Sequence, residues 1–308
     1  MRLGKKAVWV SVLMAGSASA APLFDASLGT TPSAQGWPLL RDPILGHSVS
    51  ETLGAGFTAL DSRNPISDKG GYFSEDPFFG VLRHPAFPAT LDRVAGFTVR
   101  VDLRIVGENH PPRDDNGDGL DDRAGFSLIV VTDDLSAIEI GFWDDQVWAY
   151  EDDAFVAGDF FTHAESALLD TTAQLRSYAL TILGDRYTLR VDGATRLSGP
   201  LRDYSSFTGS PNVYAIANFA FFGDDTSSAE GAVELAYYDI TDDAPPHCPA
   251  DLNFDGVVDL SDLAGLLAAF GACAGDAAYS ISADLNNDGC VELADLAGLL
   301  AAFGTSCG

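Results

Sequence analysis

The stretch YALTILGDRYTLRVDGATRL, residues 178–197, determines most of what can be predicted about the fold. It contains three short runs rich in apolar and β-branched residues, and two turn residues separate each run from the next. Gly184-Asp185 and Asp192-Gly193 are dipeptides that favour the two-residue turns of β-hairpins. The stretch therefore predicts three consecutive antiparallel strands.

Similar patterns extend in both directions from this meander. In FTVRVDLRIV, residues 97–106, apolar side chains alternate with Thr, Arg and Asp, as in a strand with one buried face. Further strands are predicted at residues 125–131, 137–143, 146–150, 213–222 and 232–240. Many short strands separated by turns are typical of an antiparallel sandwich, so we expect a mostly β domain over residues 21–243.

Three segments of this domain resemble the concanavalin A-like and laminin G-like jelly rolls. They are LFDASLGTTPSAQGW at 23–37, YTLRVDG at 187–193, and GDDTSS at 223–228 followed by VELAYYDIT at 233–241. The resemblance implies a jelly-roll β-sandwich whose relatives bind glycans or proteins, with some hydrolysing polysaccharides. The aromatic residues Trp37, Tyr72, Phe73, Trp143, Trp148 and Tyr150 are candidates for stacking on sugar rings, or for packing in the core.

No catalytic residue is predicted for this domain. Enzymatic relatives carry a run of acids written E-x-D-x-x-E, and the nearest stretch here is EIGFWD at 139–144. Gly141 replaces its middle acid, so we interpret Glu139 as an ordinary outward-facing strand residue. The pattern G-x-S-x-G is absent, and His47, His84, His110 and His163 are scattered. A catalytic site assembled from residues far apart in the sequence stays open.

An acidic cluster, DDNGDGLDD at 114–122, lies inside the domain and matches the first half of a calcium loop. The candidate ligands are Asp114, Asn116, Asp118, the Leu120 carbonyl, and Asp121 or Asp122. Gly125 occupies the place of the closing acid, so the second half of the motif fails. A third calcium site and a solvated acidic turn are the two alternatives.

The last 61 residues contain an internal repeat, DLNFDGVVDLSDLAGLLAAFG at 251–271 and DLNNDGCVELADLAGLLAAFG at 284–304. Each copy begins with a loop that fits the positions of an EF-hand, in which alternate residues direct oxygens at one Ca²⁺ ion. The predicted ligands of the two ions are Asp251, Asn253, Asp255, Val257, Asp259 and Asp262, and then Asp284, Asn286, Asp288, Cys290, Glu292 and Asp295. After each loop, leucines and a phenylalanine recur at helical spacing, which predicts a short amphipathic helix closed by Gly271 or Gly304.

Residues 248–308 resemble the dockerin family on the strength of these two loops. The resemblance implies a small α module with two EF-hand-like loops, folding that depends on calcium, and docking onto a cohesin-like partner. It places the partner-binding residues at the start of each helix, at Leu260 and Ser261 and at Leu293 and Ala294. The basic residues that many dockerins carry further along the helices are missing here.

All four cysteines lie in this tail, which predicts two disulfides with three possible pairings. The length of each helix disfavours Cys248–Cys273 and Cys290–Cys307. The antiparallel helix packing that the resemblance implies instead predicts Cys273–Cys290 and Cys248–Cys307.

The composition limits the remaining possibilities. The formal net charge of −28 argues against nucleic acid and anionic membranes as partners. Residues 1–20 combine a basic start, a short apolar run and Ala18-Ser19-Ala20, which predicts a signal peptide, and no later stretch is apolar enough to insert in a membrane. Residues 244–247 are a predicted linker between the two modules.

We therefore expect a secreted or cell-surface protein whose β-sandwich recognises a glycan or a protein and whose dockerin docks it to a scaffold. The alternative is a glycoside hydrolase, or another enzyme of polysaccharide catabolism, carried by the dockerin.

Overall fold

The computed structural model describes residues 21–40, 49–63, 69–78, 80–152, 161–242, 248, 250–253, 256–274, 276, 278–286 and 288–306. The predicted signal peptide, residues 1–20, and the predicted linker, residues 244–247, lie outside these ranges. None of the helices in the described part is long and apolar enough to cross a membrane.

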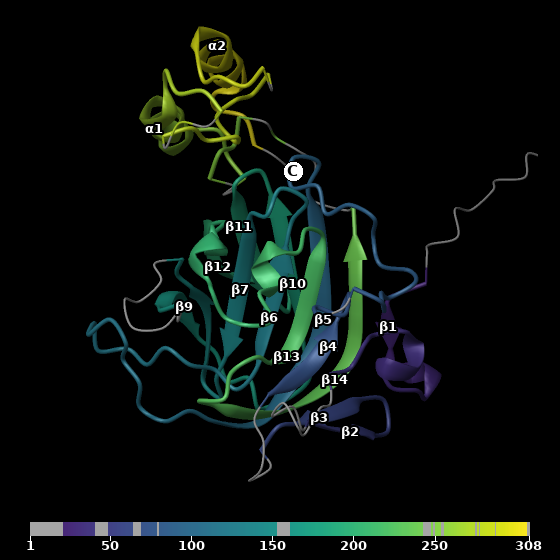
Figure 1. Cartoon of the computed structure of the whole chain (residues 1–308). Coiled ribbons are helices and arrows are strands. Elements are labelled where there is room, and N and C mark those ends of the chain that lie inside the picture. The colour runs from purple at the N-terminus through teal and green to yellow at the C-terminus, as the bar shows by residue number, and fades with distance from the viewer. Residues whose placement is uncertain are drawn as a thin grey trace, which may run out of the picture.

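Two antiparallel sheets account for most of the described chain (Figure 1). The first sheet has eight strands, in the order β12 (Ala194–Pro200), β11 (Arg186–Val191), β10 (Arg176–Leu183), β5 (Phe97–Asn109), β14 (Glu230–Thr241), β3 (Thr58–Asp61) and β2 (Ser50–Leu53), with β1 (Phe24–Asp25) also paired to β14. The second sheet has six strands, in the order β4 (Gly70–Phe73), β13 (Phe219–Asp224), β6 (Ser127–Val131), β7 (Ala137–Phe142), β8 (Gln146–Tyr150) and β9 (His163–Leu168). The mostly β class and the antiparallel sandwich are thus confirmed.

The meander at 178–197 forms the outer part of the first sheet, as its turn dipeptides predict. Tyr178 pairs with Val191 and Leu183 with Arg186, so Gly184-Asp185 is the connecting turn. Asp192 and Gly193 both have positive φ, at 52° and 83°, which a type I′ turn requires. The predicted strand at 213–222 begins later than expected, because residues 213–215 form the 3₁₀ turn η4 (Val213–Ala215).

The main core lies between the two sheets. From the first sheet, β5 contributes Val99, Val101 and Leu103, which are almost completely buried. From the second sheet, β7 contributes Ile138 and Ile140. The alternation of apolar and polar residues in β5 therefore corresponds to a strand with one face buried in the core, as predicted.

The second sheet is covered on its outer face as well. A second apolar cluster on this face joins Ile129 and Phe221 of the sheet to Tyr204 and Tyr214 of the segment 201–216, which runs across it. This segment contains η3 (Tyr204–Ser206) and η4. All five residues of β6 and all six residues of β7 are consequently buried. Two further 3₁₀ turns, η1 (Ala26–Leu28) and η2 (Ser33–Gln35), follow β1.

The tail folds into two helices, α1 (Leu260–Ala269) and α2 (Leu293–Ala302), around a small core of its own. Backbone hydrogen bonds cross between the repeats in the same way twice. Val258 donates to the Thr305 carbonyl at 3.0 Å, and Val291 donates to the Ala272 carbonyl at 2.9 Å. The end of each helix is therefore tied to the loop of the other repeat.

The predicted apolar face of each helix is only partly buried. Leu266 and Leu299 are completely buried, but Leu267 and Leu300 are 54% and 53% exposed, and Phe270 and Phe303 are each 42% exposed. Leu263 and Leu296 pack partly buried against the tail core, whereas the exposed Leu267, Leu300, Phe270 and Phe303 form an apolar surface.

Candidate functional site

A cavity of about 350 Å³ lies on the outer side of the second sheet. Its floor is made by strand residues, among them Ile129 of β6, Tyr150 of β8 and Phe221 of β13, and the segment 201–216 closes it with Val213 and Tyr214. Further aromatic side chains in its wall are Phe73, Phe161 and Phe207. Its charged side chains are Glu139, Asp224, Asp225, Lys69, Arg113 and Arg123.

Glu139 reaches this cavity from β7. Because Ile138 and Ile140 point into the main core, the side chain between them projects from the opposite face of the strand. Glu139 is only 2% exposed, and the Tyr214 hydroxyl donates a short hydrogen bond to its carboxyl group. The interpretation of Glu139 as an ordinary outward strand residue is therefore wrong, because the segment 201–216 covers that face of the sheet.

Asp225 is the second carboxyl of the cavity, and it comes from the connection between β13 and β14. Burial raises the pKa of Glu139 well above its usual range, and the negative charge of Asp225 and a hydrogen bond to Asp225 raise it further. Burial also raises the pKa of Asp225. Two adjacent carboxyls in such surroundings repel one another when both are ionised, so protonation of one of them relieves the repulsion. No sequence motif links these two acids, since 85 residues lie between them.

Three tyrosines position Glu139. Burial raises the pKa values of the Tyr150, Tyr204 and Tyr214 phenols, so each phenol keeps its proton. The Tyr204 hydroxyl donates to the Tyr150 carbonyl at 3.0 Å and accepts the Glu139 backbone N–H at 3.3 Å. Glu139 is thus held at both its backbone and its side chain.

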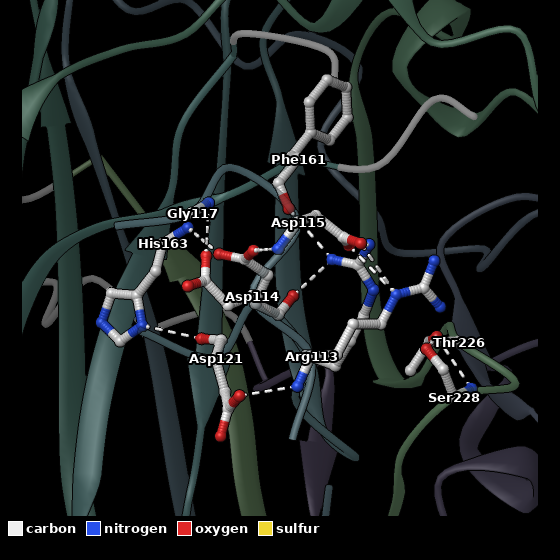
Figure 2. A network of polar contacts seen from close by, with 11 residues as sticks. Arg113, Asp114, Asp115, Gly117, Asp121, Phe161, His163, Thr226 and Ser228 are labelled. Atoms are coloured by element: carbon white, nitrogen blue, oxygen red, sulfur yellow. Dashed lines mark hydrogen bonds and ion pairs between the residues drawn. The ribbon is translucent and has the colours of Figure 1, made fainter. Parts of the chain in front are cut away.

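The acidic loop 114–122 holds the two arginines that line the cavity, Arg113 and Arg123, and Figure 2 shows the network of polar contacts around Arg113 and Asp115. Asp115 accepts a hydrogen bond from the Arg113 Nε at 3.1 Å and forms a very close ion pair with Arg123. Arg123, which is 3% exposed, also donates to the Phe161 carbonyl at 3.1 Å. One carboxylate therefore holds both guanidinium groups at the cavity.

The acidic loop has the same internal hydrogen bonds as the second loop of the tail. Asp114 accepts from the N–H groups of Asp118 and Gly119 at 3.1 and 2.8 Å. Asp284 accepts from the corresponding N–H groups of Asp288 and Gly289 at the same two distances. The glycines at the sixth position of the two loops have the same backbone conformation, with φ of 92° at Gly119 and 93° at Gly289.

Of the two alternatives Asp121 and Asp122, it is Asp122 that takes the position of the closing acid in loop 114–122. It accepts from the backbone N–H of Asp115, the second residue of its loop, at 2.6 Å. Asp262, the closing acid of the first tail loop, accepts from the second residue of that loop, Leu252, at 2.7 Å. Asp122 also accepts from the His163 N–H at 2.8 Å, so it is fixed to β9. The Leu120 carbonyl remains a candidate ligand, while Asp121 accepts from the Arg113 N–H instead.

The tail loops present oxygen-rich donor sets. Asp251, Asp262, Asp284 and Asp295 are between 0% and 4% exposed, and residues 248–308 contain no lysine or arginine to offset their charge. Asp255 lies outside the described residues. Across the described part of the chain, no three Asp, Glu, His or Cys side chains gather closely enough to hold an ion by themselves. Calcium loops also use amide and carbonyl oxygens, which Asn253, Val257, Asn286 and Cys290 supply here, so the residues present fit a Ca²⁺ ion.

The predicted partner-binding residues lie on the tail surface. Leu260 and Leu293 are each 72% exposed, and Ser261 and Ala294 are exposed beside them. Of the two predicted disulfides, Cys273–Cys290 is present. Cys307 lies outside the described residues, so its pairing with Cys248 stays a prediction.

Most of the aromatic residues proposed for sugar stacking belong to the core. Trp37, Tyr72 and Trp148 are at most 1% exposed. Phe73 and Tyr150 line the cavity. Trp143 is half-buried and stacks on His110, with ring centroids 4.3 Å apart.

No family model matches the sequence, and no curated protein matches it in sequence. In structure, the chain is similar to a conserved carbohydrate esterase from the Shiga toxin-encoding bacteriophage phi24B, at 13% identity over 71% of this chain and 97% of that chain, with a TM-score of 0.45. It is similar to an alginate lyase of polysaccharide lyase family 7 at 12% identity over 67% and 94%, with a TM-score of 0.36. It is similar to the carbohydrate-binding module CBM66 from Bacillus subtilis at 10% identity over 67% and 95%, with a TM-score of 0.35. None of these scores reaches 0.5, and none assigns a family or an activity to this chain.

Proposed function

We propose that the β-sandwich, as a jelly-roll recognition domain, binds a carbohydrate chain in the cavity that contains Glu139 and Asp225. The cavity carries this proposal, because it combines aromatic walls with a few fixed polar groups. Aromatic faces stack on the apolar faces of sugar rings, and buried carboxyl and phenol groups bind sugar hydroxyls directionally. A volume of about 350 Å³ is sufficient for one or two sugar rings of a longer chain.

A variant that fills the mouth of the cavity tests this proposal. Ser227 is exposed and lines the cavity, so Ser227→Trp should block it without disturbing the buried residues. Ser198→Trp, on exposed β12 of the other sheet, is the matched control. On a glycan array, we expect the wild type and Ser198→Trp to bind the same glycans and Ser227→Trp to lose them. Equal binding by Ser227→Trp would place the glycan elsewhere.

We further propose that the tail is a dockerin-type module that binds two Ca²⁺ ions and docks the exported protein onto a cohesin-like protein or scaffold. The buried acids of its loops and the exposed Leu260 and Leu293 support this assignment. The disulfide Cys273–Cys290 supports export, because disulfides persist in oxidising compartments. We propose a third Ca²⁺ ion at loop 114–122, held by Asp114, Asn116, Asp118, the Leu120 carbonyl and Asp122.

Cleavage of the bound polysaccharide is the second candidate function. A carboxyl pair that holds one proton favours it, since such a proton can pass to a glycosidic oxygen. The short distance between the two carboxyls weighs against cleavage. The two carboxyls are in hydrogen-bond contact, whereas glycosidases need about 5 Å or more between theirs. Release of reducing ends by the wild type, abolished in Glu139→Gln, would make cleavage the function. We expect no release from either protein.

A further inference from the structure

We infer that the turn between β10 and β11 locks the tail to the β-sandwich, so that the two modules form one rigid unit with a fixed docking direction. This inference goes beyond the proposed function and stands whatever ligand the cavity takes. The contact that carries it joins Asp185 of the sandwich to Ser280 and Ser282 of the tail, and we call it the Asp185 contact. These serines lie between the two repeats.

Both carboxylate oxygens of Asp185 and its backbone N–H form hydrogen bonds with the tail. The Ser280 hydroxyl donates to its Oδ2 at 2.6 Å, and the Ser282 hydroxyl donates to its Oδ1 at 2.7 Å. The Asp185 backbone N–H donates in return to the Ser282 Oγ at 3.3 Å. Hydrogen bonds to a carboxylate are stronger than those between neutral groups, and two hydroxyls on two oxygens define an orientation as well as a distance.

The sandwich presents Asp185 on a fixed turn. The Gly184 N–H donates to the Arg93 carbonyl at 2.7 Å, and the Arg93 Nη1 donates to the Gly184 carbonyl at 3.0 Å. Gly184 has φ of 62°, and a Cβ there would lie 2.3 Å from the Ser282 Oγ. A glycine at this turn therefore allows the tail to approach the backbone closely.

The tail presents its two serines on a turn of its own. The Ser280 carbonyl accepts from the N–H groups of Ala283 and Asp284 at 3.1 and 3.3 Å. The Tyr279 hydroxyl donates to the Asp284 Oδ2 at 2.8 Å. Because hydrogen bonds fix both partners of the Asp185 contact internally, the contact transmits orientation from one module to the other.

Charge makes a specific contact necessary. The tail has no lysine or arginine, and the chain as a whole carries −28, so the two modules repel one another at low salt. The neutral serine hydroxyls give Asp185 hydrogen-bond donors from a module that has no lysine or arginine to pair with it.

The contact leaves the apolar surface of the tail open. Leu260 and Leu293 are equally exposed, and so are Phe270 and Phe303. The sandwich therefore covers neither helix face in preference to the other. Figure 1 shows both helices at the end of the sandwich, beyond the β10 and β11 strands. A partner that binds either face would meet the sandwich in a set orientation.

Backbone ¹⁵N relaxation of the full chain in calcium-containing buffer tests the inference. We expect one rotational correlation time for amides of both modules in the wild type. In Asp185→Ala, the tail amides should shift to a shorter correlation time while the sandwich amides change much less. Asp133→Ala, at an exposed position in the turn after β6, should behave like the wild type.

The double variant Ser280→Ala/Ser282→Ala removes the same contact from the other side and should reproduce the effect of Asp185→Ala. Dispersed tail resonances in each variant establish that the module is still folded. Two separate correlation times in the wild type, or a single one retained in both Asp185→Ala and the serine variant, would overturn the inference.

Discussion

The pKa of Glu139 is raised because the segment 201–216 covers it, and not because of the strand to which it belongs. A glutamate on the solvent face of a sheet would ionise freely and contribute little to the pH dependence of stability. Here the Tyr214 hydroxyl and Asp225 meet Glu139 beneath the segment 201–216, in a wall that is largely aromatic. The charged form of Glu139 is therefore disfavoured, and the folded protein keeps a proton that the unfolded chain releases.

Stability should consequently depend on pH through Glu139. The pKa of Glu139 is raised in the folded state above its ordinary value of 4.5. Stabilisation by the protonated form is therefore complete below that value and is lost as the pH rises through the raised folded pKa. Over this window each pH unit costs about 1.4 kcal/mol of unfolding free energy per proton.

Glu139→Gln should remove this part of the pH dependence. We expect the unfolding free energy of the variant to fall less steeply than that of the wild type as the pH rises above 4.5, the ordinary pKa of a glutamate. Urea unfolding followed by tryptophan fluorescence measures it, because residues 248–308 contain no tryptophan. Asp133→Asn serves as the control. Identical slopes in wild type and Glu139→Gln would mean that Glu139 is ionised in the folded state.

The residues of the cavity show why the sequence could not predict it. Glu139 was visible as an acid between two isoleucines, in a strand where neighbouring residues are apolar on both faces, and that was a signal of burial. Asp225 carried no such signal, because a loop 86 positions further along the chain brings it to the cavity. Pairing of side chains across a sandwich depends on the path of the connections, which local patterns do not contain.

At the scale of elements, the loops were predictable where the motif was complete. Both tail repeats were recognisable from their acids and glycines, and their helices begin and end close to the predicted positions. The loop 114–122 was ambiguous because its closing acid, Asp122, comes three positions earlier than the motif requires. The backbone turns tightly enough there to return Asp122 to the start of the loop.

Calcium stoichiometry distinguishes the three loops. We expect three Ca²⁺ ions per chain in the wild type, measured by equilibrium dialysis with atomic emission. Asp118 is exposed, so Asp118→Ala should reduce the number to two without affecting the fold. An unchanged count in Asp118→Ala would identify loop 114–122 as a solvated turn, and a count below two in the wild type would contradict the tail sites.

The two neighbouring leucines of α2 provide a direct test of the tail core. Leu299 is completely buried and Leu300 is 53% exposed. Leu299→Ala should destabilise the tail by about 3 kcal/mol, which lowers the protection of its amides about a hundredfold in hydrogen exchange. Leu300→Ala should change the stability of the tail by less than about 0.5 kcal/mol. Equal effects of the two substitutions would contradict the helix packing described here.

At the scale of the whole molecule, the sequence predicted two modules but not how they meet. The meander 178–197 was identified from its turn dipeptides, which act locally. That the first of those turns would also contact the tail could not be predicted, because Gly184-Asp185 is an equally good hairpin turn in isolation. The Asp185 contact depends on the positions of Ser280 and Ser282, 95 and 97 residues further along the chain.

The resulting arrangement separates the two proposed activities in space. The cavity faces outward from the second sheet, whereas the tail lies at the end of the sandwich beside the β10–β11 turn (Figure 1). A partner bound to the apolar surface of the tail would therefore leave the cavity open to a carbohydrate. Both sites can operate in one molecule.

The central claim is that carbohydrate binds in the cavity that contains Glu139 and Asp225, and the most direct measurement is an amide chemical-shift titration of the ¹⁵N-labelled protein with a library of neutral and acidic oligosaccharides. We predict shift changes concentrated on the amides of Ile129, Glu139, Tyr214 and Asp225, and their loss in Ser227→Trp. Shift changes confined to the first sheet or the tail, or none with any oligosaccharide in the library, would contradict the claim.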